Sequence, residues 1–535
     1  MRIKKLPDWF VNNENYFFFF IVILNLYPVL VFRYFPTMDG AAHLYNSNLL
    51  VEMLTNSASR VHNFFAFNPQ IVPNWTGHIV MGIVTSVFPA YIAEKSILII
   101  YLFGLPLSFR RLLVKGLKTD PALSYLIFPL VYTFLFINGF YNYSIGIVFM
   151  FIAINYWVQN RNKFTLKKGL IFFLFVYLVY FSHLFIFMVF GLVIFVLLIY
   201  DFLITLREEK NKWPALVKEI VALLIIFALS FILSIDLFTS GKFSGGEASR
   251  LPLSRLFDWL FDVRASIGFF YDKEAIINNV YFGAIVLLVL YILYHTISKL
   301  LNNGFSISKV FSYSRVWLVI SLILLALYFA IPNHLPGRGG HMSVRFLIVF
   351  YIFFVLWLAT QKYPIYVKRF VIAISIFSCF WLLGLRTKVI KRQNKVANEI
   401  VSYEKLIKPH SIILPIRYSK VWLQGHYHNY LGINRPQIML ENYECDVGVF
   451  PLKWNKERIP KLKFGNVNQK ELCIKWPEGN NTSTQEIEYV FIWGLKDKKK
   501  HPKKCTKKID RVLQSNYILI RETKTAKLFR LKDME

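Results

Sequence analysis

The sequence repeatedly shows apolar runs about as long as a membrane-spanning helix. A hydrocarbon core of ~30 Å requires about 20 helical residues. Runs of this kind lie at 16–35, 95–113, 122–138, 142–159, 169–183, 184–205, 218–237, 279–298, 316–332, 344–360 and 366–386. Of the 535 residues, 56% are hydrophobic and only 17% are charged, which is not typical of soluble domains. We therefore expect a polytopic α-helical membrane protein with eleven to thirteen transmembrane helices.

One further apolar stretch, residues 76–112, admits two interpretations. It is too long for a single crossing at about 1.5 Å of rise per residue, and Glu94 and Lys95 divide it. We expect one crossing together with a helix that lies at the periplasmic surface of the same membrane. Two crossings are the alternative, and they would reverse the orientation of all later segments.

Lys and Arg collect in short clusters between the apolar runs. If the chain crosses eleven times, six clusters lie on one side, namely the N-terminus, 110–118, 161–168, 207–218, 299–315 and 361–369. Cytoplasmic loops hold such an excess, so we expect a cytoplasmic N-terminus and a periplasmic C-terminus. The 52 Phe residues and frequent Ile, Asn and Lys are typical of an AT-rich bacterial genome, which favours a bacterial cytoplasmic membrane. The orientation of the chain in the membrane thereby explains the net charge of +31, so we expect membrane lipids and no nucleic acid as partners.

The chain becomes polar and rich in turns after about residue 386. Alternating or β-branched runs predict strands at 411–416 and 488–494 and a hairpin at 517–531, while 388–407 has the pattern of an amphipathic helix. About 150 residues suffice for a small domain. We expect a transmembrane domain at 1–386, in which 36–75 forms the first periplasmic loop, and a soluble periplasmic α/β domain at 387–535.

The cysteines do not form a recognisable pattern. Cys379 lies in an apolar run, and three others lie in the tail, at Cys445, Cys473 and Cys505. Their spacing supports neither a disulfide framework nor a zinc site. We expect no metal site from them.

An acid and a histidine follow the first apolar run, in "PTMDGAAHLYN". A carboxylate near the bilayer is costly, so Asp39 is a candidate functional residue. It also precedes a helix-compatible stretch, 40–54, and its oxygen could serve as an N-cap. His43 is four residues further along and would share a helical face with Asp39. We expect both residues at a catalytic site, and capping does not exclude this for Asp39. For His43, a histidine that is hydrogen-bonded at the water interface is the alternative.

A second concentration of polar residues lies in the loop "IPNHLPGRGGHMSVRF", 331–346. It contains His334, Arg338, His341 and Arg345. Its glycines permit close approach of the backbone, and Arg binds phosphate oxygens in a bidentate manner. The helix that follows adds the positive end of its dipole. The loop therefore predicts a phosphate-binding site, with contact to ordinary lipid headgroups as the alternative.

Weaker candidates lie on the same predicted side. "NGFYNYSIG" contains Tyr141 and Asn142, and "YFSHLF" contains His183, all of which we expect to support the site. In the tail, His426 and His428 are spaced to share one face of a strand. Such a pair could hold a metal, but an ordinary surface strand is the expectation.

These features resemble the C-type glycosyltransferase superfamily of the membrane, which uses polyprenyl-phosphate sugars and includes protein mannosyltransferases and aminoarabinose transferases of lipid A. The likeness lies in Asp39 after the first span, the multi-span body, the basic residues on the outer side and the soluble C-terminal domain. "GFYNYSIG", "GRGGHMSVRF" and "NYECDVGVFPLKW" also look like segments of bacterial members. Many members carry an acidic pair in the first loop, where this chain has Asp-Gly and then His43. The second acid and a divalent cation are therefore left open.

The resemblance implies an enzyme that transfers a hexosyl or pentosyl group from a polyprenyl-phosphate donor to an acceptor glycan, lipid or protein. Asp39 would be the general base of an inverting displacement, and Arg345, with Arg338 or His341, would stabilise the departing phosphate. A transporter or flippase for a lipid-linked or anionic compound is the alternative, although no repeated pair of broken helices is visible. A non-catalytic envelope scaffold is a third hypothesis.

Overall fold

The computed structural model describes residues 8–161, 165–208, 213–239, 247–303, 313–336, 340–455, 487–501 and 503–532. Two compact units are present. Unit 1 comprises Met1–Val31 and Leu98–Val389, and unit 2 comprises Phe32–Ile97 and Ile390–Glu535. The segment after the first helix thus packs with the C-terminal part of the chain, although some 290 residues separate them in sequence. The domain limits 1–386 and 387–535 stay a prediction.

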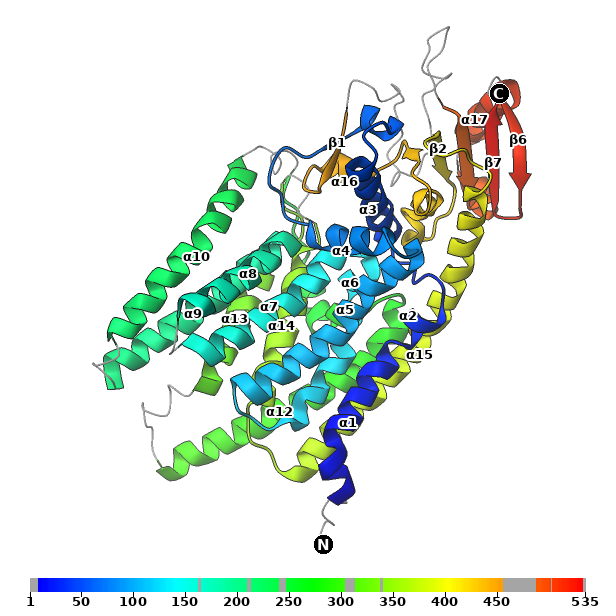
Figure 1. Ribbon diagram of the computed structural model, residues 1–535. Helices are drawn as coiled ribbons and strands as arrows, with labels where there is room; N and C mark the ends of the chain where they lie inside the picture. Colours follow the sequence, from blue (N-terminus) through cyan, green and yellow to red (C-terminus); the bar gives the residue numbers. More distant parts are fainter. Residues whose placement is uncertain are drawn as a thin grey trace. The chain divides into compact units, whose positions relative to one another are not determined.

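Unit 1 is helical (Figure 1). Its helices are α1 (Asp8–Asn25), α2 (Tyr27–Val31), most of α5 (Ala90–Arg111), α6 (Phe134–Asn138), α7 (Tyr141–Asn160), α8 (Leu166–Ser182), α9 (Leu184–Glu208), α10 (Trp213–Thr239), α11 (Leu253–Phe261), α12 (Tyr271–Asn303), α13 (Tyr313–Ala330), α14 (Met342–Ala359) and most of α15 (Ile365–Glu404). Within the described residues, seven helices are long and apolar enough to cross a membrane: α5, α7, α9, α10, α12, α14 and α15. The chain is therefore a polytopic α-helical membrane protein, as expected.

One predicted span takes a different form. Residues 122–138 were expected to be one crossing helix, but they form a 3₁₀ helix, Pro121–Leu130, followed by the short α6. Pro129 lacks a backbone N–H, and the Thr133 hydroxyl starts a new helix by accepting from the N–H of Phe136. Residues 76–112 divide into the ten-residue α4 (Thr76–Thr85) and α5, and only α5 has the length of a crossing.

The core of unit 1 centres on α14, in which sixteen of eighteen residues are buried. Aromatic side chains fill the space around it: the ring of Phe353 stacks on Phe151 at 5.4 Å and lies parallel to Trp317 at 6.3 Å between centroids. A helix buried on nearly all sides is expected to be apolar throughout, which explains why its run in the sequence has no polar face.

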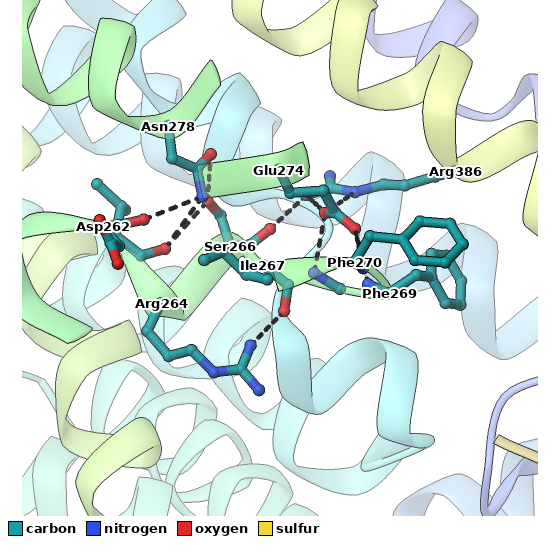
Figure 2. Close-up of polar contacts among 11 residues, drawn as sticks. Asp262, Arg264, Ser266, Ile267, Phe269, Phe270, Glu274, Asn278 and Arg386 are labelled. Carbon is teal, nitrogen blue, oxygen red and sulfur yellow. Dashed lines mark hydrogen bonds and ion pairs between the residues drawn. The ribbon is translucent and has the colours of Figure 1, made fainter. Parts of the chain in front are cut away.

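A buried polar network holds the loop before α12 (Figure 2). The Glu274 carboxylate accepts hydrogen bonds from the backbone N–H groups of Gly268, Phe269 and Phe270, at 2.9, 2.7 and 3.0 Å. Arg386 on α15 pairs with the same carboxylate at 2.9 Å and also donates to the carbonyl of Ser266. Both side chains are almost completely buried, so each charge requires the other.

Unit 2 contains a five-stranded sheet in the order β3-β2-β5-β7-β6. The strands are β2 (Ile412–Arg417), β3 (Ile438–Met439), β5 (Tyr489–Trp493), β6 (Tyr517–Glu522) and β7 (Ala526–Leu531). Strand β2 pairs in parallel with β3 and β5, and β7 pairs antiparallel with β5 and β6. The predicted strands and hairpin are confirmed. Unit 2 also contains α3 (Gly40–Thr55), α4, α16 (Tyr443–Val447), α17 (Lys503–Asn516), the pair β1 (Phe65–Phe67) and β4 (Leu452–Trp454), and short 3₁₀ helices.

Two details of the predicted tail are corrected. The amphipathic helix expected at 388–407 is not separate, because α15 runs without a break from Ile365 to Glu404. His426 and His428 do not lie on a surface strand. His426 precedes the 3₁₀ helix Tyr427–Gly432, and His428 is buried within that helix.

Candidate functional site

Asp39 occupies the N-cap position of α3 but does not cap the helix. Its side chain makes no capping hydrogen bond, and the Thr37 hydroxyl instead accepts from the N–H of Gly40 at 3.1 Å. The alternative in which the carboxylate only caps the helix is therefore wrong. Asp39 is only 5% exposed, so a costly buried carboxylate is kept for contacts other than capping.

The groups nearest to Asp39 come from the C-terminal half of the chain. The Tyr443 hydroxyl hydrogen-bonds the carboxylate, and Nε2 of His426 lies 3.7 Å from its Oδ1. Burial raises the pKa of the Asp39 carboxyl to about 6, against the lowering effect of His426 and His43. The pKa thus approaches the range in which a carboxylate serves well as a general base.

His426 connects Asp39 to a second acid. Its Nδ1 lies 3.3 Å from Glu441, which also contacts Nε2 of His428. Burial lowers the pKa of His426, but Glu441 and Asp39 outweigh it and the net pKa lies above the ordinary value. For Glu441, burial favours the neutral acid, yet His428 and His426 hold its pKa well below the usual range. We call Asp39, His426, His428, Glu441 and Tyr443 the Asp39 cluster.

His43 belongs to a neighbouring arrangement with Glu444. The two carboxylate oxygens of Glu444 lie 2.8 Å from Nδ1 of His43 and 2.8 Å from Nε2 of His78 on α4. Burial raises the pKa of Glu444, but His78 and His43 lower it to about 2. We call these three buried residues the Glu444 clamp. Both the clamp and the triplet His426, His428 and Glu441 have side chains of the kinds that bind metals.

A reciprocal amide pair holds the two halves of this region together. Asn46 donates to Asn442 at 3.0 Å and Asn442 donates to Asn46 at 2.7 Å, across 396 residues of sequence. Asn46 is seven residues after Asp39, so Asp39, His43 and Asn46 share one face of α3. Sequence reasoning found Asp39 and His43 but missed Tyr443 and Glu444. Both residues lie in the segment "NYECDVGVFPLKW", whose local pattern does not predict a role for either.

Unit 1 contains a separate cationic group around Arg345. Nη1 of Arg345 lies 3.4 Å from Nε2 of His183, its guanidinium lies over the ring of Phe140, and its carbonyl accepts from the Tyr143 hydroxyl. Nδ1 of His183 accepts from the N–H of Phe185 at 3.2 Å, so in the neutral ring the proton is on Nε2. Arg345 and His183 therefore present two donors to each other rather than a donor and an acceptor.

The other residues expected near Arg345 divide into three groups. His341, in a left-handed conformation before α14, contacts His334 and Phe140, and burial and Arg345 lower its pKa to about 4. Its ring is thus neutral at pH 7. Arg338 lies outside the described residues. Tyr141 and Asn142 are buried at the start of α7, whereas the contact with His183 is made by Tyr143, which sequence reasoning missed.

One more cation of unit 1 had not been expected. Arg264 lies 3.8 Å from the centre of the Phe134 ring. It also donates to the carbonyl of Ile267 at 2.6 Å, a bond that Figure 2 shows. Arg264 also acts electrostatically on His341 and contributes to its lowered pKa. No sequence pattern marks Arg264, because it lies in a loop where solvated charges are common.

The comparisons with known proteins show a likeness to solved structures but not to a family model. No protein-family model matches the chain, and no curated protein matches it. The crystal structure of ArnT from Cupriavidus metallidurans bound to undecaprenyl phosphate is similar, with a TM-score of 0.53 and 9% identity, over 98% of each chain. At this identity the likeness concerns the fold. The chain therefore has the fold of ArnT, which confirms the fold that the resemblance implied.

Proposed function

We propose that the protein is a membrane glycosyltransferase, which transfers a sugar from a polyprenyl-phosphate donor to an acceptor at the outer face of the bacterial cytoplasmic membrane. The fold shared with ArnT, whose structure contains undecaprenyl phosphate, supports a lipid-linked donor. Fold alone does not determine function, so the proposal depends mainly on the Asp39 carboxylate.

Asp39 has the properties that a general base requires. The carboxylate is buried, makes no capping bond and is held by the Tyr443 hydroxyl, with His426 close by. A fixed carboxylate of this kind can accept the proton of an attacking hydroxyl while the bond to the anomeric carbon forms. A single displacement then inverts the configuration, as in other inverting sugar chemistry.

Arg345 and His183 have the properties that a leaving phosphate requires. A guanidinium N–H and an imidazole N–H approach each other without an acceptor between the two nitrogens. An anionic oxygen that approaches both nitrogens from the side would accept from both, and bonds to a charged acceptor are stronger than neutral ones. Negative charge grows on the phosphate as the sugar departs, so donors fixed in advance favour the transition state.

The test is transfer of radiolabelled sugar from a panel of polyprenyl-phosphate donors by the purified full-length protein. We expect Asp39→Asn to lower kcat by about 10²- to 10⁴-fold. Asp120→Asn is the matched control, since Asp120 does cap a helix, through the N–H of Ala122, and is exposed. It should keep the wild-type rate.

The other outcomes discriminate among the hypotheses. Full activity in Asp39→Asn would show that Asp39 is not the general base. No transfer from any donor, together with donor movement across liposomes by the wild type, would instead favour a transporter.

A further inference from the structure

The contacts of His78 determine which of its ring nitrogens carries the proton, and they have no part in the proposed sugar transfer. Its Nδ1 lies 2.9 Å from the carbonyl oxygen of Asn74, which can only accept a hydrogen bond. The proton of a neutral ring must therefore be on Nδ1. Nε2 then presents a lone pair to a carboxylate oxygen of Glu444 at 2.8 Å, and two acceptors at that distance require a cation between them.

Two cations can satisfy this arrangement, a second proton on His78 or a metal ion. In metal-binding histidines, the nitrogen that does not bind the metal usually donates to a backbone carbonyl or a carboxylate. The bond from Nδ1 of His78 to Asn74 has this form. It fixes the tautomer and turns Nε2 toward Glu444.

The rest of the clamp supplies further ligands. Nδ1 of His43 lies 2.8 Å from the other oxygen of Glu444, and ligand atoms of the three residues lie within 4.8 Å of one another. The three side chains are 5% exposed or less. The ring of Phe450 lies 5.8 Å from both imidazoles and forms an apolar wall. Two imidazoles and one carboxylate are a common ligand set for zinc, with one coordination position left over.

The triplet in the Asp39 cluster differs in this respect. Nε2 of His428 contacts Glu441, and among the described residues Nδ1 of His428 has no hydrogen-bond partner. A single proton on Nε2 of a neutral His428 therefore satisfies Glu441. That triplet does not require a metal, although its side chains are of the same kinds.

We infer that His43, His78 and Glu444 form a binding site for one divalent transition-metal ion, with zinc the best fit. The ion joins α3 and α4 to α16, although His78 and Glu444 are 366 residues apart in the sequence of unit 2. Because a site of this kind is absent from the unfolded chain, binding stabilises the folded state. The inference is independent of sugar transfer, and its test measures metal rather than activity.

The first measurement is the metal content of the full-length protein, purified without chelators and supplied with zinc, by elemental mass spectrometry. We expect about one zinc ion per chain in wild type. In His78→Gln the zinc content should fall by at least about tenfold, because the substitution removes a ligand. His428→Gln is the matched control and should retain the ion. Removal of zinc from wild type by a chelator should lower the Tm by about 5 °C, and zinc should restore it.

A second measurement does not depend on the folding of a variant. X-ray absorption at the zinc edge of the wild-type protein should show only nitrogen and oxygen ligands at about 2.0–2.2 Å, including two imidazoles. Zinc content near zero would overturn the inference and assign the clamp to a protonated His78. Loss of zinc in His428→Gln with retention in His78→Gln would place the ion in the other triplet, and would also overturn it.

Discussion

Arg345 and His183 form a pair whose chemistry depends on the number and direction of their N–H groups. A guanidinium offers a planar fork of donors, whereas the ammonium of Lys is a compact point charge. Arg345→Lys keeps the positive charge but removes the fork. If this pair binds the donor phosphate, we expect the KM for the lipid donor to rise by about tenfold or more, with the KM for the acceptor unchanged.

Initial rates measured over a range of donor concentrations would check this expectation. Arg255→Lys is the matched control, because Arg255 is exposed on α11 and the same exchange there should leave both KM values unchanged. An unchanged donor KM in Arg345→Lys would show that the fork does not hold the donor. A similar rise of the donor KM in both variants would show that the effect is not specific to the Arg345 site.

The limits of sequence reasoning are clearest for single residues. Asp39 was identifiable because a carboxylate after an apolar run is unusual, and His43 followed from helical spacing. Glu444 and Tyr443 were not identifiable, because their nearness to α3 depends on contacts across almost the whole chain, such as that of Asn46 with Asn442. Local patterns carry no information about such pairings.

Among the elements, the loop before α12 depends on one buried ion pair. Glu274 satisfies three backbone N–H groups and Arg386 at once (Figure 2). Glu274→Gln keeps one acceptor oxygen but leaves the Arg386 charge buried without its partner, which costs about 3–5 kcal/mol. We expect a clear fall in Tm for the purified protein.

The reverse change provides a comparison. Arg386→Gln should destabilise by a similar amount, and the double variant should be less destabilised than the sum of the two, because each single change leaves a lone charge. Thermal unfolding of the wild type, both single variants and the double variant would check this. Strict additivity would show that the pair is not coupled.

Secondary structure was predictable where the hydrophobic period was long and uninterrupted. The runs at 142–159 and 344–360 correspond to α7 and α14, and the strand at 411–416 corresponds to β2. The run at 122–138 was not predictable as a 3₁₀ helix, because its hydropathy is the same in either form and only the prolines signal a break. Composition alone therefore overestimates how long an uninterrupted helix is.

For the whole molecule, the orientation of the chain in the membrane is the most direct prediction to test. The Lys and Arg distribution predicts that the N-terminus lies in the cytoplasm and that the C-terminal segment lies outside. Single cysteines at Lys118, Lys167 and Lys524, which are all exposed, would report on three segments. They would be introduced after replacement of the four native cysteines, Cys379, Cys445, Cys473 and Cys505.

Labelling with a membrane-impermeant maleimide separates the alternatives. We expect Lys118→Cys and Lys167→Cys to react only in inverted vesicles, and Lys524→Cys only in intact spheroplasts, because eleven crossings put the first two positions on the cytoplasmic side. Reaction of all three from the opposite sides would mean that residues 76–112 cross twice. If Lys118→Cys behaved as expected while the other two were reversed, the Pro121–Leu130 helix and α6 would not cross at all, and the broken geometry of that segment would explain why.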